Sequence, residues 1–557
     1  MIKNIFTLFL ILIVMVSCQQ KSDVTLYYNV KGYTFAEDEL KEFNTLAFRD
    51  NMVLGTGSED DLRSEYPAAQ MINGEGNVML PGLIDAHGHV MGLGYQQMNA
   101  NVTGLSSLEE TLDKVKKYAR TYPEVQWIEG RGWNHTHWEI NRFPTSTDLD
   151  KAVSDKPVWL RRVDGHAGWA NSAAMEIAGI TSDTEAPDGG KIIRDDNGNP
   201  TGVFIDAAMQ LIEKHIPEPT EEEKQKALEM ALERTKSVGL TGTHDAGIGP
   251  DTWELYKKIA DKDKLTMRIY AMIGGGGSTF DELARKGPVE SYGDEMLSLR
   301  SVKLYADGAL GSRGAAMLED YSDDAGNKGL LFKTEEEFEK TIHKTASAGF
   351  QTNVHAIGDR ANRVVLNAFE TVNEQLKDPG NSLRHRIEHA QIVAPEDIPR
   401  FKELNIIASM QPTHATSDMN MAGDRIGSER LEGAYAWQTF LEQGTVVASG
   451  SDYPVESANP FWGLYSAVTR QNHDGQPPEG WRTEEAMNRK QALKSFTVDA
   501  AYAGFNEDIT GSLEEGKRAD FILIDRDYFT VPESEIYQTN ILETWVDGRK
   551  VYDEADQ

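Results

Sequence analysis

The chain has 557 residues, of which 39% are hydrophobic and 26% charged, and its formal net charge at pH 7 is −33. This length fits one large domain with appendages, and the composition is that of an ordinary globular protein rather than a disordered one. The negative charge argues against nucleic acid as a partner, because it would repel the phosphates. With one cysteine in the sequence, no disulfide can support the fold.

The N-terminus has the layout of a bacterial secretion signal. A basic start, MIKN, is followed by IFTLFLILIVMV, an apolar run too short to span a membrane comfortably, and then by SCQQ. The stretch MVSC resembles the lipobox of bacterial lipoproteins, in which the cysteine, here Cys18, is lipidated. We therefore predict a signal peptide over 1–18 and an exported protein, anchored to a bacterial membrane through Cys18 and facing the periplasm or the outside. The alternative is a plain signal peptide with an incidental cysteine.

Both ends of the remaining chain predict short strands. VTLYYNV, NTLAFRDNMVLGTG and GEGNVML precede residue 81, and GSLEEGKRADFILIDRD and ILETWVDGRKVYDE follow residue 510. Alternating apolar strands at both termini suggest that 19–80 and 505–557 build one small composite β-sandwich domain.

Residues 81–504 alternate apolar strands with helical patterns, which indicates parallel strands joined by crossover helices. Eight strand ends can be counted: GLIDAHGH, VGLTGTHDAG, RIYAMIGGGG, SVKLYADGA, FQTNVHAIGD, RHRIEHAQ, IIASMQPTH and TVVASGSDYP. Eight βα units predict an α/β fold of the TIM (β/α)8 barrel type, with its chemistry at the carboxyl ends of the strands. Residues 98–235 are too many for one crossover, so we expect an inserted lobe there, after the first strand, that covers the barrel mouth.

Polar side chains of the kinds that bind metals follow five of these eight strands. In a strand, residues i and i+2 point to one face, so the two histidines of the DAHGH stretch should project into the same space, where two neutral imidazoles suit a metal ion. Each residue alone has a structural explanation, but their joint appearance at strand ends favours a metal site. The set consists of His87, His89, Lys303, His355, His389 and Asp452.

These strand ends resemble the amidohydrolase superfamily, and VKLYADGALGSRGA, VHAIGDRA, RIEHAQ, QPTHA and GSDYPV resemble its YtcJ-like members, relatives of N-substituted formamide deformylase. The resemblance implies two divalent metal ions, most plausibly zinc, bridged by a carboxylated Lys303. It places His87, His89 and Asp452 on one metal and His355 and His389 on the other. It also implies that Asp452 acts as general base and then general acid on a carbon–nitrogen bond of a small molecule. The alternative for Lys303 is a strand lysine that reaches solvent or Asp307.

Three further residues are candidates for substrate binding. His414 follows the seventh strand, His166 lies in the expected lobe, and Arg313 lies in GSRGA, where it could meet a carboxylate or carbonyl group. For each of them, a structural hydrogen bond in a loop is an equal alternative. The tryptophans of the lobe segment could line an apolar pocket or pack in the lobe's own core.

Two other functions stay open on the sequence. One is a mononuclear metal deaminase of the same superfamily, although VHAIGD lacks the nearby glutamate that such enzymes use. The other is an inactive, lipid-anchored binding protein on the same barrel, which the full set of ligand-type residues disfavours. The sequence does not name the substrate or the oligomeric state, and homo-oligomerisation is left open.

Overall fold

The computed structural model describes residues 23–140 and 142–556. Cys18 and the predicted signal peptide lie outside the described residues. Within the described part of the chain, no helix combines the length and the apolar character needed to cross a membrane.

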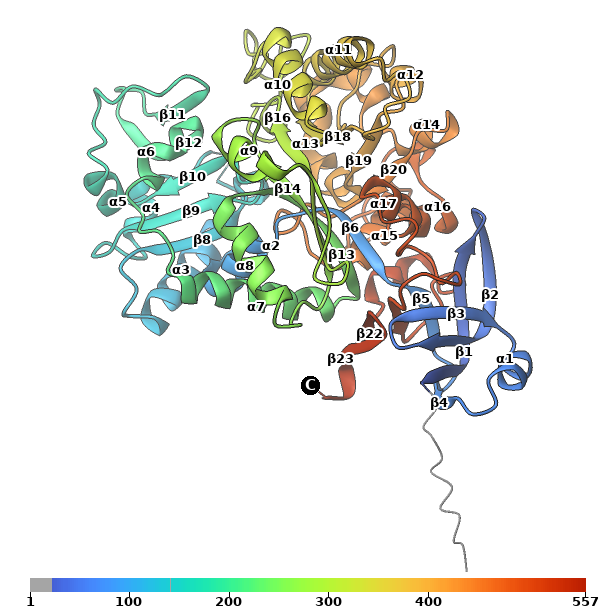
Figure 1. Cartoon of the computed structure of the whole chain (residues 1–557). Helices are drawn as coiled ribbons and strands as arrows, with labels where there is room; N and C mark the ends of the chain where they lie inside the picture. The colour runs from blue at the N-terminus through green and yellow to red at the C-terminus, as the bar shows by residue number, and fades with distance from the viewer. Residues whose placement is uncertain (1–22, 141, 557) are drawn as a thin grey trace, which may run out of the picture.

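A nearly closed barrel of eight parallel strands forms the centre of the molecule (Figure 1). The eight strand ends expected from the sequence are its strands, in the same order, so the prediction of a TIM-type barrel is confirmed. Hydrogen bonds link the segments after the first and last strands, from His89 N to Tyr453 O at 2.8 Å and from Asp452 N to His87 O at 2.7 Å. The barrel strands are β6 (Leu83–Gly88), β13 (Leu240–Ile248), β14 (Arg268–Gly274), β16 (Leu297–Tyr305), β17 (Gln351–Ala356), β18 (Arg386–His389), β19 (Ile407–Met410) and β20 (Val447–Ser449).

Amphipathic helices cover the outside of the barrel and carry clear start signals. In α10, Phe338 and Ile342 are buried against the barrel, and a capping box of Thr334 and Glu337 satisfies backbone amides at its N-terminus. The helices that follow strands are α2 (Val90–Met98), α7 (Glu221–Lys236), α8 (Pro250–Ala260), α9 (Ser278–Leu283), α10 (Glu335–Ser347), α11 (Asp359–Leu376), α12 (Ile398–Glu403), α13 (Pro412–Arg430), α14 (Trp437–Glu442), α15 (Pro460–Thr469), α16 (Arg489–Ser495) and α17 (Val498–Ala503).

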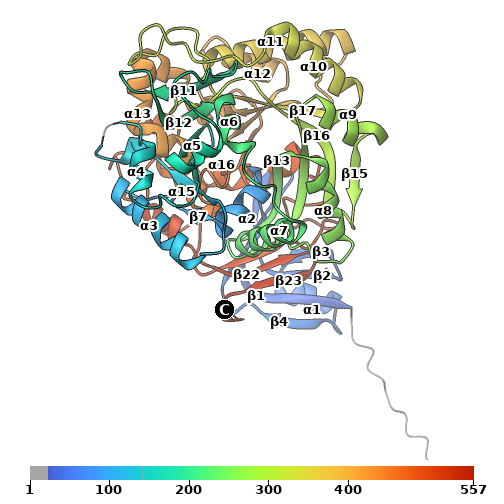
Figure 2. The ribbon, with the colours of Figure 1, turned by 90° about the vertical axis from the view of Figure 1, so that its left-hand side faces the viewer.

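Strands from both termini form one eight-stranded sheet beside the barrel, seen as blue and red arrows side by side in Figures 1 and 2. The two halves meet where β21 pairs antiparallel with β5, with Phe521 opposite Pro81. The rings of Phe521 and Trp545 stack at 5.2 Å in its core. The strands are β1 (Val24–Ala36), β2 (Glu39–Arg49), β3 (Met52–Gly57), β4 (Gln70–Asn73), β5 (Val78–Pro81), β21 (Phe521–Ile524), β22 (Ile541–Val546) and β23 (Arg549–Asp553), and the short α1 (Glu59–Glu65) follows β3.

A separate lobe is inserted between β6 and β13 and stands on another side of the barrel (Figure 1). Residues of its six-stranded sheet and of the segments beside it form a core that contains Trp133, Trp138 and Trp169. Helix α7, which ends the expected insertion, packs on α2 and β13 and thus belongs with the barrel helices. The lobe contains β7 (Ala100–Asn101), β8 (Ile128–Trp133), β9 (Val158–Arg162), β10 (Ala167–Ala170), β11 (Gly190–Arg194), β12 (Pro200–Asp206), α3 (Leu108–Thr121), α4 (Ser146–Asp150), α5 (Ser172–Ile177) and α6 (Gln210–Glu213).

Candidate active site

A cavity of about 1550 Å³ lies where the carboxyl ends of the barrel strands meet the inserted lobe. This is the position at which barrels of this type place their chemistry. All six of the predicted ligand-type residues line it, namely His87, His89, Lys303, His355, His389 and Asp452.

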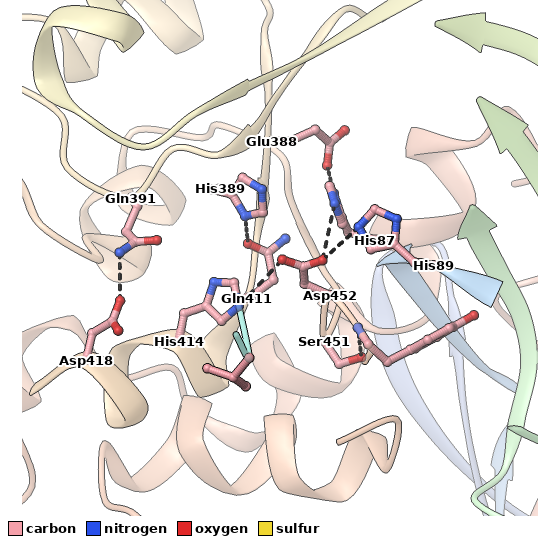
Figure 3. A network of polar contacts seen from close by, with 12 residues as sticks. His87, His89, Glu388, His389, Gln391, Gln411, His414, Asp418, Ser451 and Asp452 are labelled. Carbon is pink, nitrogen blue, oxygen red and sulfur yellow. Dashed lines mark hydrogen bonds and ion pairs between the residues drawn. The ribbon is translucent and has the colours of Figure 1, made fainter. Parts of the chain in front are cut away.

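His87 is fixed by the carboxylate of Glu388, which lies on β18 across the barrel. Its Nδ1 lies 2.5 Å from Glu388 Oε2 (Figure 3). Its Nε2 lies 3.0 Å from Lys303 Nζ. Burial lowers the pKa of His87 to about 4, so the imidazole is neutral at pH 7. With a proton on Nδ1 directed at Glu388, the lone pair of Nε2 faces the cavity, as a metal ligand requires.

Asp452 follows β20 and faces His87, near the end of β6, and His89, directly after it. Its Oδ1 lies 3.0 Å from His89 Nε2 and 3.7 Å from His87 Nε2. Burial alone would raise the pKa of Asp452, but the hydrogen bond with His89 and the nearby imidazoles hold it well below its usual range. Asp452 has a positive φ of 59° and His389 one of 75°. Such backbone strain in non-glycine residues is typical of functional sites.

His355 and His389 form a second pair of imidazoles across the cavity. Their ring centres lie 4.5 Å apart, and His389 Nδ1 contacts Gln411 Oε1 at 2.7 Å, which leaves Nε2 free for another partner. His355 Nε2 is buried and makes no hydrogen bond, although Asp307 Oδ1 lies 3.5 Å away. Burial lowers the pKa of both histidines well below the ordinary value, so both are neutral.

Lys303 is buried, with 1% of the residue exposed, and it forms no ion pair with any described residue. Burial lowers the pKa of its amine to about 8. It does not reach solvent, and Asp307 is instead occupied by the backbone amides of Ala316, Ile357 and Gly358 at 2.8–3.0 Å. Lys303 is therefore not a strand lysine that reaches solvent or pairs with Asp307.

The donor set fits divalent metal ions. One ligand atom each from His87, His389 and Asp452 lie within 4.8 Å of one another. His355 Nε2 is buried without a hydrogen-bond partner, which costs free energy unless another group engages it. Neutral imidazoles and an ionised carboxylate are the ligands that zinc-type ions take in proteins.

Two of the three predicted substrate-binding residues reach this cavity. His166 extends from the lobe to within 5.6 Å of the His355 ring, measured between centroids, and its Nδ1 contacts Asp206 Oδ1 at 2.8 Å. His414 Nε2 lies 3.8 Å from Asp452 Oδ2. Arg313 is not brought to the cavity lining, because its guanidinium binds Asp323 through two hydrogen bonds of 3.0 and 2.9 Å.

The lobe tryptophans, left open by the sequence, pack with one another rather than line the cavity. Their indole N–H groups donate to backbone carbonyls inside the lobe. His244, on β13, is buried and accepts a hydrogen bond from Arg386 at 2.8 Å, which gives it a structural role.

Sequence reasoning missed the residues that orient the ligands. Glu388 holds His87, Arg386 holds Glu388 at 2.7 Å, and Gln411 holds His389. A signal was present in RIEH, because Arg386 and Glu388 are charged residues inside a buried strand, where an unpaired charge would be very costly. Such residues indicate partners inside the barrel, here His87 on β6 and His244 on β13, across from β18.

The barrel, the cavity at its carboxyl face and the donor set define a metal-dependent hydrolase. The model of a family described as amidohydrolases matches residues 70–552. The Bacillus subtilis protein YtcJ is 33% identical over 91% of this chain and 95% of its own length. N-substituted formamide deformylase of Arthrobacter pascens is 29% identical over 88% and 92%.

Among solved structures, an uncharacterized metal-dependent hydrolase from Pyrococcus horikoshii superposes with a TM-score of 0.75 and 26% identity, covering 92% of this chain and 99% of that one. The chain belongs to the amidohydrolase family, and its similarity to the YtcJ-like members extends over nearly the whole chain.

Proposed function

We propose that this protein is a binuclear metal-dependent amidohydrolase that cleaves an amide-type carbon–nitrogen bond of a small molecule. The observation that carries the proposal is the convergence of neutral imidazoles, an ionised Asp452 and a buried Lys303 on one cavity, with the buried His355 Nε2 lacking a hydrogen-bond partner. His87, His89 and Asp452 would hold one ion, most plausibly zinc, and His355 and His389 the other.

Bound metals of this kind lower the pKa of water and polarise a carbonyl oxygen. The chain's own residues supply position and proton transfer. Asp452 faces the cavity with both carboxylate oxygens, so it can accept the proton of the attacking water and deliver it to the leaving nitrogen. His414, beside Asp452, and His166, held by Asp206, stand where they can form hydrogen bonds with the substrate.

The role proposed for Lys303 is that of a carbamate. Its neutral amine attacks carbon dioxide, forms a nitrogen–carbon bond and releases one proton. The lowered pKa favours the neutral amine needed for this step, and the product offers two anionic oxygens where an ammonium offers none. Enclosure of the side chain keeps water from competing for it.

Metal analysis of purified protein separates this proposal from the other functions. We expect two zinc ions per chain and activity on a panel of formamides, acyl-amino acids, hydantoins and cyclic amides, assayed with protein truncated after Cys18. A single ion with deaminase activity would favour the mononuclear alternative. A metal-free protein without hydrolase activity, even after incubation with zinc and bicarbonate, would favour an inactive binding protein.

A further inference from the structure

One arginine of the lobe faces the cavity without a carboxylate partner. Arg131, on β8, lines the same cavity as His89 and Asp452. Its Nε and Nη2 donate to the Val163 carbonyl at 3.3 and 2.9 Å, which fixes the plane of the guanidinium. No described residue accepts a hydrogen bond from Nη1. A rigid cation is thus presented to the cavity.

The neighbouring arginines are balanced, whereas Arg131 is not. Arg161, its register partner on β9, pairs with Glu213 at 2.9 Å, and Arg162 pairs with Asp164. Arg131 forms no ion pair with any residue in the described ranges. Burial lowers the pKa of Arg131 to about 10, which still leaves it cationic at pH 7. Asp452 and Asp164 act on Arg131 only from beyond ion-pair distance, so a half-buried cation without an ion pair would gain from an anion that enters the cavity.

A second donor faces the cavity from the barrel side. Tyr305 ends β16, is 41% exposed, and places its ring 5.3 Å from the ring of His355. No described residue bonds to its hydroxyl group. A phenolic hydroxyl is protonated at pH 7, so Tyr305 can donate a hydrogen bond to a group in the cavity.

We propose that the substrate carries a carboxylate, which Arg131 binds and to which Tyr305 donates a hydrogen bond; this rests on the proposed hydrolysis of an amide. The substrate class is then an amide with a carboxylate on the lobe side of the scissile bond, as in an N-acyl amino acid. The planar guanidinium suits a carboxylate better than a point charge would. The net charge of −33 does not oppose this, because salt screens charges beyond about 8 Å at physiological ionic strength while the contact is local.

The test compares substrates that differ only in this group. N-formyl and N-acetyl derivatives of glycine, alanine and phenylalanine are assayed beside the N-formyl and N-acetyl derivatives of the matching amino alcohols, in which CH2OH replaces the carboxylate. We expect zinc-loaded enzyme to prefer the acids by about tenfold or more in kcat/KM, and Arg131→Met to lose this preference, measured as the ratio of kcat/KM on each acid to that on its matching alcohol. Arg131→Lys should keep part of the preference. Arg161→Met, which removes a cation already balanced by Glu213, is the matched control and should keep it.

A binding measurement keeps this inference separate from the proposed function. Calorimetry follows the binding of 4-oxopentanoate, in which CH2 replaces the amide NH of N-acetylglycine so that no hydrolysis occurs, to zinc-loaded enzyme. Arg131→Met should weaken this binding about tenfold relative to both wild type and Arg161→Met. Amide turnover without preference for the acids, or a preference that survives Arg131→Met, overturns the carboxylate subsite and leaves the hydrolase intact. Absence of all amide turnover contradicts the proposed function, and the calorimetry then decides the subsite: equal affinities overturn it, and a tenfold loss supports it.

Discussion

At the scale of single residues, two of the ligand-type imidazoles in the cavity have a partner that fixes them from behind. Glu388 engages Nδ1 of His87, and Gln411 engages Nδ1 of His389. Both contacts direct Nε2 toward the cavity, so the site is preorganised by hydrogen bonds rather than by the imidazoles alone. Asp452 differs, because both of its oxygens face the cavity histidines, and this is the arrangement a proton carrier needs.

Asp452→Asn should leave a folded, metal-binding barrel with little activity. The amide keeps the shape and one ligand oxygen, but it cannot accept and return a proton, so kcat should fall by about 10²- to 10⁴-fold. The measurement is kcat with circular dichroism and metal content on the same sample. Near-normal turnover by metal-loaded Asp452→Asn protein would contradict the role of Asp452.

Glu388→Gln should weaken metal binding by about 10- to 100-fold without removing any metal ligand, because the neutral amide orients and polarises His87 less strongly. The measurement is the zinc dissociation constant by competition with a chelator, at a temperature where the variant is folded. Glu485→Gln is the matched control, since Glu485 is a buried carboxylate bonded to Thr439 outside the cavity. An unchanged dissociation constant in Glu388→Gln would show that His87 does not depend on this contact.

The sequence contains enough to find the ligand-type residues but not the residues that orient them. His87, His89 and His355 stand out because polar residues end apolar runs, and the alternation of strands assigns them a face. Glu388 depends on which atoms meet across the barrel between β18 and β6, and no periodicity within one strand contains that information. The position of Arg313 could not be predicted either, because it depends on the hydrogen bonds with Asp323 in the same loop region, which hold the guanidinium outside the cavity.

At the scale of elements, the closing edge of the barrel aligns the segments that carry His87 and Asp452. Asp85, on β6, accepts hydrogen bonds from the His87 amide at 3.0 Å and from the amide and hydroxyl of Ser451 at 3.0 and 2.6 Å. Burial raises the pKa of Asp85 to about 7, against the effect of these hydrogen bonds. One side chain thereby fixes the distance between the ends of β6 and β20, where three of the ligand-type residues lie.

Gly450→Ala should disturb this edge. A Cβ at Gly450 would lie 2.5 Å from His87 N and 2.6 Å from Asp85 Oδ1, and neither backbone nor a bonded carboxylate can move away cheaply. We expect a loss of about 1–3 kcal/mol of stability, as for overpacking, together with reduced metal content. Gly380→Ala is the control, because its Cβ would meet open space. Thermal unfolding and metal analysis that match wild type would show that the edge is not tightly constrained.

At the scale of the whole molecule, a buried ion network joins the barrel to the sheet built from both termini. Arg268 of β14 binds Asp520 at 2.8 and 3.1 Å and Asp547 at 3.0 Å, and Arg518 also binds Asp547 at 3.0 Å. The eight strand ends and the pairing of the two termini were readable from apolar patterns. This network was not, because it brings together residues more than 250 positions apart.

Arg268→Met should destabilise the protein by about 3–5 kcal/mol, since it leaves Asp520 and Asp547 buried with less compensation. Arg549→Met is the matched control. Arg549 also links the composite sheet to the barrel side, through Asp263 at 2.5 Å, but both side chains are exposed, so its loss should cost about 0–1 kcal/mol. Urea unfolding of the two variants gives the comparison, and equal losses would mean that the buried network does not couple the sheet to the barrel.

Attachment of the whole molecule to a membrane should depend on one residue near the N-terminus, Cys18. We propose that Cys18 carries a lipid and is the membrane anchor, because the apolar run before it ends in MVSC. An acidic protein is repelled by anionic headgroups, so attachment should depend on the lipid rather than on charge. Cys18→Ser should therefore move the processed protein from the membrane pellet to the soluble fraction, with kcat/KM unchanged because the cavity lies in the folded domain. Fractionation after a high-salt wash measures this. If Cys18→Ser protein still pellets with membranes after its signal has been removed, the anchor lies elsewhere and the lipobox interpretation is wrong.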